Sequence, residues 1–155
     1  MKNENTYIVG VIAEYNPFHN GHQYHIQKSK EITKSKYCIA VMSGDFVQRG
    51  APAIYDKYTR TKMALECGAD LVIELPSIFA SSSAEDFASC GIALLDKLGV
   101  VDSVCFGSES GDIEELKAIS SILAAEPPVY TESLKEELKK GAAYPKARQT
   151  ALELS

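Results

Sequence analysis

The chain lacks any long hydrophobic stretch. Of its 155 residues, 45% are hydrophobic and 24% are charged, and no apolar run approaches the roughly 18 to 20 residues that a membrane-spanning helix needs. The first residues lead into an apolar segment without the hydrophobic region of a cleavable signal. These features predict a globular cytoplasmic protein with no membrane partner, and the length predicts a single domain over residues 1–155.

Paired cysteines are absent as well. The four cysteines lie far apart in the sequence, and no two of them form a Cys-x-x-Cys motif: they are Cys38, Cys67, Cys90 and Cys105. Zinc sites and disulfide frameworks use closer, paired spacings. We therefore expect free thiols, buried among apolar neighbours.

Positive charge is scarce. Lysine and arginine number 16 against 21 aspartate and glutamate, which gives a formal net charge of −5. Proteins that bind nucleic acid tightly usually present a net basic surface to the phosphates, so this segment is not expected to bind RNA strongly by itself. One basic stretch is interpreted as a solvated helix face rather than an RNA contact; its lysines are Lys28, Lys30, Lys34 and Lys36.

Apolar, β-branched runs alternate with segments of helical composition. Strands are predicted at residues 7–13, 37–42, 69–75 and 100–106, and helices at 21–33, at 56–67, between residues 82 and 99, after Asp112, and twice after Pro127-Pro128. The first helix is expected to have Asn20 as its N-cap and Ile26 and Ile32 on its inner face. A capping box of Ser82 and Glu85 is predicted to begin a later helix. The order predicts an α/β fold with a parallel sheet and helices on both faces.

The only three histidines lie within one short run, at His19, His22 and His25. The run follows the first predicted strand and contains His-x-Gly-His at a predicted helix start. In an open parallel sheet, ligands bind at the carboxyl ends of the strands. Gly21 lets the backbone approach a ligand, and the free amides and dipole of a helix start attract phosphate. The run therefore predicts a phosphate site for a nucleoside triphosphate.

Two of these histidines are suited to catalysis. His19 and His22 bracket Gly21, and as hydrogen-bond donors they could neutralise charge that develops between the α-phosphate and the departing pyrophosphate. We predict that both are catalytic, with Pro17 fixing the approach of the chain. Two other interpretations stay open. The histidines could be surface residues at a helix start, or His22 and His25 could bind a metal, although no acidic or cysteine ligand stands at a suitable spacing.

The run from Gly10 to His25, with Asn-Pro-Phe-His-Asn-Gly-His at its centre, resembles the opening of the bacterial tRNA(Met) cytidine acetate ligases, a branch of the HxGH nucleotidyltransferase-like proteins. The resemblance continues at residues 41–50 and 52–54, at Lys57 and Arg60, and at residues 68–76, 106–109 and 144–148. His-x-Gly-His alone occurs in many adenylyl-transferring enzymes, whereas the long blocks together are specific.

The resemblance implies a Rossmann-like nucleotidyltransferase fold and a ligase reaction. ATP would activate acetate as acetyl-adenylate, and the acetyl group would pass to N4 of the wobble cytidine of elongator tRNA(Met). ATP is the implied co-substrate, accompanied by Mg²⁺ as the ATP complex, and no metal site of the protein's own is expected. The tRNA would bind mainly through a portion beyond residue 155, so residues 1–155 are expected to be a C-terminally truncated fragment with weak activity or none.

By the same resemblance, the ATP contacts fall on one continuous segment and one distant glycine. The segment comprises Ile12, Ala13, Glu14, Tyr15, Asn16, Pro17, Phe18, His19, Asn20, Gly21, His22, Gln23, Tyr24 and His25. The glycine is Gly107, which follows the fourth predicted strand. A position without a side chain there would let the nucleotide lie against the backbone.

Charged residues outside this segment are secondary candidates. Arg49, in the connection spanning residues 45–53, is a candidate anion contact. Lys57 and Arg60 lie at i and i+3 on a predicted helix, where a solvated face is favoured over a phosphate contact. Glu74 and Glu109 lie near strand ends, where a carboxylate could bind a ribose hydroxyl or Mg²⁺.

Two rival functions stay open. Related nucleotidyltransferases carry a second phosphate-binding signature, rich in Ser and Thr and ending in Arg, which this sequence lacks. A nucleotidyltransferase that acts on a phosphate-bearing metabolite and a non-catalytic ATP-binding module are therefore the alternatives to the ligase.

Overall fold

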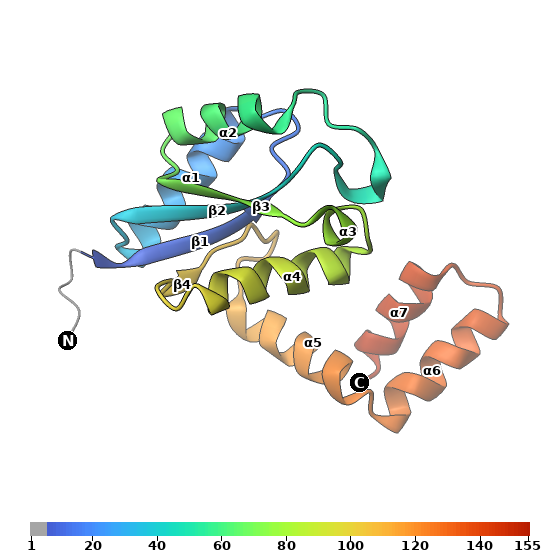
Figure 1. Cartoon of the computed structure of the whole chain (residues 1–155). Helices are drawn as coiled ribbons and strands as arrows, with labels where there is room; N and C mark the ends of the chain where they lie inside the picture. The colour runs from blue at the N-terminus through green and yellow to red at the C-terminus, as the bar shows by residue number, and fades with distance from the viewer. Residues whose placement is uncertain (1–5) are drawn as a thin grey trace. The chain divides into compact units, whose positions relative to one another are not determined.

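The computed structural model describes residues 6–155, apart from the side chain of Arg49. Contacts within the chain divide it into two compact units, one ending at Gly107 and the other spanning Ser108–Ser155 (Figure 1). The single domain expected over residues 1–155 stays a prediction.

The first unit is built on a four-stranded parallel sheet in the order β3-β2-β1-β4. The strands are β1 (Ile8–Ala13), β2 (Tyr37–Ser43), β3 (Leu71–Leu75) and β4 (Ser103–Val104). All of β1 pairs with β2, whereas only Val9 and Gly10 pair with β4. Strand β4 is therefore much shorter than the strand predicted at residues 100–106. The predicted parallel α/β sheet is confirmed.

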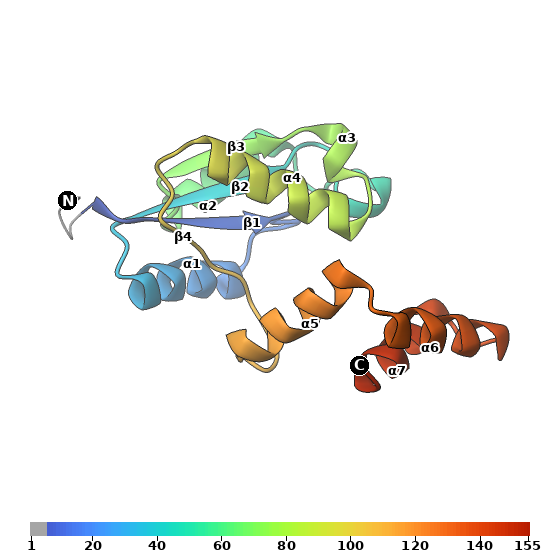
Figure 2. The same ribbon diagram turned by 90° about the horizontal axis from the view of Figure 1, so that it is seen from below.

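Helices cover both faces of the sheet, as predicted (Figure 1, Figure 2). Helices α1 (Asn20–Thr33) and α2 (Lys57–Glu66) lie on one face, and α3 (Ser77–Ala80) and α4 (Ala84–Lys97) lie on the other. Successive residues of a strand point to opposite faces, so Cys38 joins the core under α1 and α2 while Ile39 joins the core under α3 and α4. Both faces of the central strands are thus buried, which explains their continuous apolar sequence.

One predicted core residue of α1 is exposed. Ile26 is fully buried, but Ile32 is 65% exposed. An α-helix turns about 100° per residue, so a separation of six residues places Ile32 about 120° around the axis from Ile26. The two side chains therefore cannot share an inner face.

The four cysteines are free thiols, as predicted. Cys38 is buried, and this burial raises its pKa to about 11. The other three cysteines are only half-buried.

The start of α4 differs from the predicted capping box at Ser82 and Glu85. Ser83 is the N-cap, and its hydroxyl accepts a hydrogen bond from the Asp86 N–H at 3.1 Å. Ser82 instead donates to the Asp86 carboxylate at 2.6 Å. Three consecutive serines offer the same capping chemistry, and Ser83 is the one whose extended backbone (φ −64°, ψ 161°) suits an N-cap.

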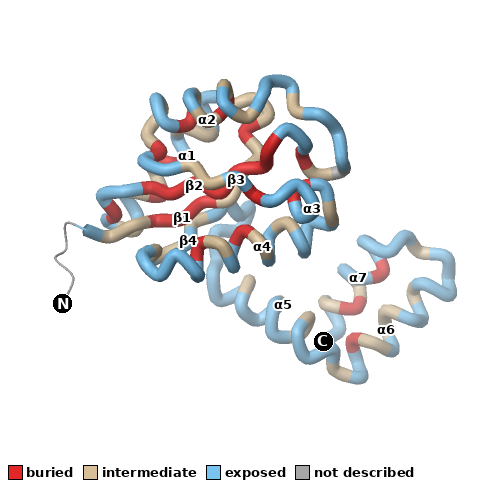
Figure 3. Tube along the Cα trace, in the orientation of Figure 1, coloured by how far each residue is buried: buried red, intermediate tan, exposed pale blue. Residues whose placement is uncertain are grey.

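The second unit is helical. It comprises α5 (Ile113–Ala125), α6 (Pro128–Lys139) and α7 (Tyr144–Glu153), which confirms the helices expected after Asp112 and after the two prolines. Tyr130, Ala147 and Ala151 are buried in the α6 and α7 pair, whereas no residue of α5 is buried (Figure 3). Within residues 6–155, the structure contains no helix of the length and apolarity that a membrane crossing requires.

Two glycines let α4 approach β1 closely. A Cβ atom added at Gly91 of α4 would lie 2.6 Å from Cδ1 and 2.9 Å from Cγ2 of Ile12. One added at Gly10 of β1 would lie 2.7 Å from Cδ1 of Leu95. Such separations are below van der Waals contact, so with any larger residue either the Ile12 or Leu95 side chain or α4 itself must shift.

We expect Gly91→Val to destabilise the protein. Inserting methyl groups into a packed contact typically costs about 1–3 kcal/mol, because side chains or backbone must shift. Ser89→Val, at an exposed position of the same helix, is the matched control and should change the free energy of unfolding by less than about 0.5 kcal/mol. Urea unfolding of both variants measures the difference, and equal stabilities would contradict the close packing.

Candidate functional site

The site lies where the order of the sheet reverses. Strands β2 and β3 lie in order on one side of β1 in the sheet. The chain then crosses over, and β4 lies on the other side of β1. Residues that follow β1 and β4 therefore flank one crevice at the carboxyl edge of the sheet, the position at which open α/β sheets bind ligands. The histidine segment, residues 12–25, follows β1, and Cys105, Phe106 and Gly107 follow β4.

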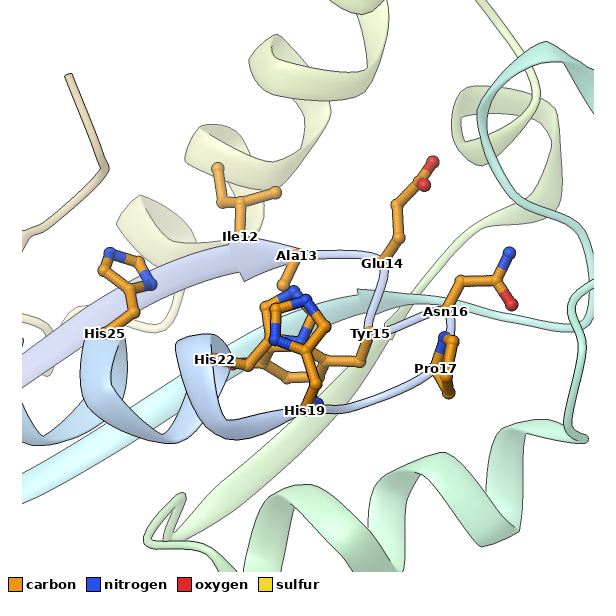
Figure 4. A pocket seen from close by; sticks show the side chains of 9 residues that line it. All are labelled: Ile12, Ala13, Glu14, Tyr15, Asn16, Pro17, His19, His22 and His25. Atoms are coloured by element: carbon orange, nitrogen blue, oxygen red, sulfur yellow. The ribbon is translucent and has the colours of Figure 1, made fainter. Parts of the chain in front are cut away.

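A pocket of about 420 Å³ opens on the histidine segment. Figure 4 shows the nine residues that line it, all of them within the predicted ATP segment: Ile12, Ala13, Glu14, Tyr15, Asn16, Pro17, His19, His22 and His25. The structure thus gathers both predicted catalytic histidines around one cavity, together with the turn that precedes them. We call this cavity the histidine pocket.

Tyr15 anchors the turn between β1 and α1. Its backbone lies in the left-handed region (φ 50°), and its side chain is only 1% exposed. The ring packs edge-on against Phe18 and His22, with centroid distances of 4.8 and 4.9 Å. Burial raises the pKa of the Tyr15 hydroxyl, so this group stays neutral. Aromatic packing against Tyr15 and Phe18 therefore fixes the position of the His22 ring.

His19, not the predicted Asn20, is the N-cap of α1. Its Nδ1 accepts a hydrogen bond from the Gly21 N–H at 3.1 Å, and Nδ1 of His22 accepts one from the His19 N–H at 3.2 Å. The two rings stack with centroids 3.7 Å apart. Asn20 is already helical, so the extended residue before it takes the cap position, and a ring nitrogen does what an Asn or Ser oxygen usually does.

This reciprocal capping decides which nitrogen of each ring carries the proton. In a neutral imidazole one nitrogen donates and the other accepts. Because Nδ1 of both His19 and His22 accepts from the backbone, Nε2 carries the hydrogen in both rings. Burial lowers the pKa of His22, and the neighbouring His19 and His25 lower it further. The site thus presents two Nε2–H donors in fixed orientations.

His25, one helical turn beyond His22, lies deeper. Its Nε2 is buried and has no hydrogen-bond partner among the described residues, and burial lowers its pKa. Across residues 6–155, no three His, Cys, Asp or Glu side chains are grouped so that they could hold a metal ion.

A second pocket of about 440 Å³ lies between α1 and the residues that follow β4. His22 and His25 line both pockets. The other residues that line the second pocket are Tyr24, Lys28, Ser29, Ile32, Cys105, Phe106 and Gly107. A Cβ atom added at Gly107 would meet no atom within 4 Å, so the backbone there is open. We call this cavity the Gly107 pocket.

The connection from β2 to α2, residues 44–56, is tied to the histidine segment. Oε1 of Glu14 accepts from the Gln48 N–H at 2.6 Å, and Oδ1 of Asn16 accepts from the Ile54 N–H at 2.7 Å. The connection thus lies beside the site. The anion contact predicted for Arg49 involves a side chain outside the described part of the structure and stays a prediction.

The solvated face predicted for Lys57 and Arg60 is wrong for Arg60. Arg60 is 0% exposed, and its guanidinium donates to backbone carbonyls. Lys57 Nζ pairs with the Glu74 carboxylate at 2.8 Å, so the predicted ribose or Mg²⁺ ligand already has a partner. Sequence alone missed the role of Arg60, because basic residues at i and i+3 of a helix are typical of an exposed face.

The remaining charged candidates are less informative. Lys28 pairs with Glu31 and Lys30 with Asp70, both within 2.8 Å, which agrees with a structural role for the basic stretch. Glu109 belongs to the second unit, and its predicted ligand role stays a prediction.

The fold and the histidine site define a nucleotide-transferring class of protein. A family model described as HIGH nucleotidyl transferase matches residues 6–155. The chain therefore belongs to the HIGH nucleotidyltransferase family.

Among known members, the chain is similar to the tRNA(Met) cytidine acetate ligases, as its sequence predicted. It is 60% identical over 146 residues to the enzyme of that name from Thermoanaerobacter sp. (strain X514) and 59% identical over 145 residues to the one from Clostridium perfringens (strain SM101). Each alignment covers 94% of this chain and 36% of the relative. The chain thus spans about a third of the length of these relatives.

Solved structures agree with this relationship. A crystal structure of Thermotoga maritima TmcAL bound with alpha-thio ATP superimposes with a TM-score of 0.87 at 51% identity, over 95% of this chain and 36% of that one. The apo form of the same protein gives a TM-score of 0.88 at 51% identity, over 95% of this chain and 35% of that one.

We expect the protein to lose stability as the pH falls below about 6.5. The pKa values of His22 and His25 are lowered in the folded state, so the unfolded chain takes up protons at a pH where the folded chain does not. Because the unfolded state binds more protons, the free energy of unfolding decreases as the pH falls, until the pH is below the pKa values of the folded state. Urea unfolding at pH 7 and pH 5.5 measures the change.

The control for this prediction is the double variant His22→Gln/His25→Gln. It should show a smaller loss of stability between the two pH values, because neither glutamine titrates. The carboxylates of Asp56 and Asp86, whose pKa values are lowered from 3.8, titrate below this window. An equal pH dependence in the parent and the double variant would contradict the assignment.

Proposed function

We propose that the chain is the ATP-binding part of a ligase that activates acetate as acetyl-adenylate and transfers the acetyl group to N4 of the wobble cytidine of elongator tRNA(Met). The observation that carries the proposal is the pair of Nε2–H donors of His19 and His22, set by backbone hydrogen bonds at the start of α1. The 60% identity to tRNA(Met) cytidine acetate ligases supports the choice of substrates.

The histidine pocket suits the triphosphate of ATP. The dipole at the start of α1 attracts phosphate, and the Nε2–H groups of His19 and His22 add two hydrogen-bond donors at the same place. An acetate oxygen attacks the α-phosphorus, the bond from that phosphorus to the bridging oxygen breaks, and pyrophosphate leaves. Acetate is already ionised at neutral pH, so the step needs positioning and charge stabilisation but no general base.

The Gly107 pocket suits the adenosine of the same ATP. It adjoins the histidine pocket through His22 and His25, and it is open at the backbone of Gly107. A largely apolar cavity with a few polar groups is the usual environment of a nucleoside base. One ATP molecule would thus lie across the end of β1, with its base on the β4 side.

Acetyl transfer completes the proposed reaction. N4 of the cytidine attacks the acetyl carbon, AMP leaves, and N4 loses a proton. Mg²⁺ would arrive with ATP and shield the phosphate charge, and no protein ligand is assigned to it. The chain carries a net charge of −5 and covers 36% of its relatives' length, so we assign tRNA binding mainly to the portion of such a ligase that lies beyond these residues. We also propose that the protein acts in the cytoplasm.

The test of the proposal is acetate-dependent exchange between ATP and pyrophosphate in the full-length protein, with His19→Asn as the decisive variant. Asparagine can place an oxygen where Nδ1 accepts from Gly21, but it has no donor in the place of Nε2–H. We expect exchange to fall by about 10²–10³-fold and the free energy of unfolding to change by less than about 0.5 kcal/mol.

His19→Ala separates the two roles of the ring. It removes both the cap and the donor, so we expect the same loss of exchange together with a loss of about 1 kcal/mol in the free energy of unfolding. Normal exchange in His19→Asn would refute the role of the Nε2–H donor. Exchange that depends on a phosphate ester instead of acetate would identify a nucleotidyltransferase of another substrate class, and ATP binding without any exchange would identify a non-catalytic module.

Gly107→Ala tests the adenosine position. The added methyl group meets no atom within 4 Å in the protein, so the free energy of unfolding should stay within about 0.5 kcal/mol of the parent value. A nucleotide lying against this backbone would clash with the methyl group, and we expect the Kd for ATP to rise about tenfold. Calorimetric titration with ATP measures this, and an unchanged Kd would place the adenosine elsewhere.

A further inference from the structure

Arg60 is the largest side chain that is fully buried among the described residues. Its Nε donates to the carbonyl of Tyr55 at 2.9 Å. One terminal nitrogen donates to the carbonyls of Glu14 at 2.6 Å and Ser43 at 3.1 Å, and the other donates to the carbonyl of Gly44. All four acceptors are backbone groups, and within residues 6–155 none of the guanidinium's hydrogen bonds goes to a carboxylate.

Such an arrangement is costly for a residue that only fills space. Taking a guanidinium out of water is unfavourable unless its donors are satisfied, and an apolar side chain of similar size usually serves a core as well or better. Arginine has a planar fork of five N–H groups that can bind several acceptors in fixed directions. The side chain is therefore suited to join segments of backbone.

The segments that Arg60 joins are those that form the carboxyl edge of the sheet. Glu14 is the first residue after β1 and directly precedes Tyr15, where the chain takes the left-handed conformation that turns it toward the histidines. Ser43 is the last residue of β2, Gly44 follows it, and Tyr55 leads into α2. One guanidinium thus holds the start of the histidine segment against the end of the neighbouring strand.

Two further hydrogen bonds run between the same segments. The Glu14 carboxylate and the Asn16 amide oxygen accept from the backbone of Gln48 and Ile54, both in the 44–56 connection. These side-chain bonds hold the outer part of the turn, whereas Arg60 holds its buried base. Removing Arg60 would free the Glu14 carbonyl and leave the turn held by these two side-chain bonds and by the packing of Tyr15.

We propose that Arg60 is a positioning residue for adenylate formation, which sets the place of His19 and His22 by holding the carbonyl of Glu14. The inference rests on the proposed function, because the catalytic test measures adenylate formation. The hydrogen bonds of Arg60 themselves do not depend on which substrate binds. Arg60 itself touches neither ATP nor acetate in this scheme. Displacing a catalytic group by about 1 Å can lower a rate by about 10²-fold, so the effect should be measurable.

The first experiment compares Arg60→Lys and Arg60→Ala with the parent, all in the full-length protein. Lysine keeps the charge, but a single ammonium cannot reach all four carbonyls. We expect kcat for ATP–pyrophosphate exchange, per folded molecule, to fall about 10-fold in Arg60→Lys and about 100-fold in Arg60→Ala. The KM for ATP should rise less than kcat falls, because Arg60 does not contact the Gly107 pocket.

Ala64→Gly is the control for a simple loss of stability. Ala64 is buried one turn further along α2, and glycine there weakens the helix without touching the four carbonyls. This variant should melt at a lower temperature and yet retain parental exchange per folded molecule. Parental exchange in both Arg60 variants would overturn the proposal.

Chemical rescue distinguishes positioning from stability. Guanidinium ion added at tens of millimolar should restore part of the exchange lost in Arg60→Ala, because it can occupy the vacated site and donate to the same carbonyls. A protein that is merely destabilised would lose more activity in guanidinium, which is a denaturant. Failure of rescue in folded Arg60→Ala, with unchanged histidine spectra, would count against the proposal.

Histidine NMR provides a readout that needs no activity. The chain has only three histidines, all in the site, and selective ring labelling reports their environment directly. We expect the ring signals of His19 and His22 to shift in Arg60→Lys and to keep their positions in Ala64→Gly. If the parent shows no acetate-dependent exchange, the proposed function fails, while this measurement still decides the role of Arg60. If Arg60→Ala does not fold, Arg60→Lys decides it alone.

Discussion

The structure of the first unit depends on the parallel pairing of β1 with neighbours on both sides. Because β2 and β4 occupy its two edges, β1 is central, and because helices cover both faces, it is buried throughout its middle. Gly10 and Gly91 allow α4 to approach the strand closely. The rigid strand then delivers its last residues to the point where the strand order reverses, which is where an open sheet of this type binds its ligand.

At that point, one set of hydrogen bonds both caps α1 and orients the histidine rings. The backbone N–H groups at the start of α1 need acceptors, and the histidine rings supply them through Nδ1. The same bonds fix the tautomer of each ring, so helix capping and the presentation of Nε2–H donors are a single arrangement. Arg60 supports this arrangement from the core. Its guanidinium donates hydrogen bonds to the backbone carbonyls of Glu14 and Ser43 at the edge of the sheet.

Sequence reasoning succeeded where the signal was local and periodic. The β-branched run at residues 7–13 has one common structural solution, and the structure confirms a strand there. The three histidines line one pocket, and their phosphate role stays a prediction. It failed by one residue at two caps, because Asn20 and Ser82 have the same capping chemistry as neighbours that the backbone placed better. It failed at Ile32 because apolar character does not specify an angle around a helix.

The sequence by itself determined the alternation of strands and helices, the clustering of the histidines after the first strand and, through long matching blocks, the family. These properties depend on neighbours in the chain. Only the tertiary structure decided that Arg60 is buried, that Lys57 pairs with Glu74, and that the histidine segment meets the residues after β4 at the Gly107 pocket. Each of these depends on groups distant in sequence, because the burial and partners of a charge are set by the elements that fold around it.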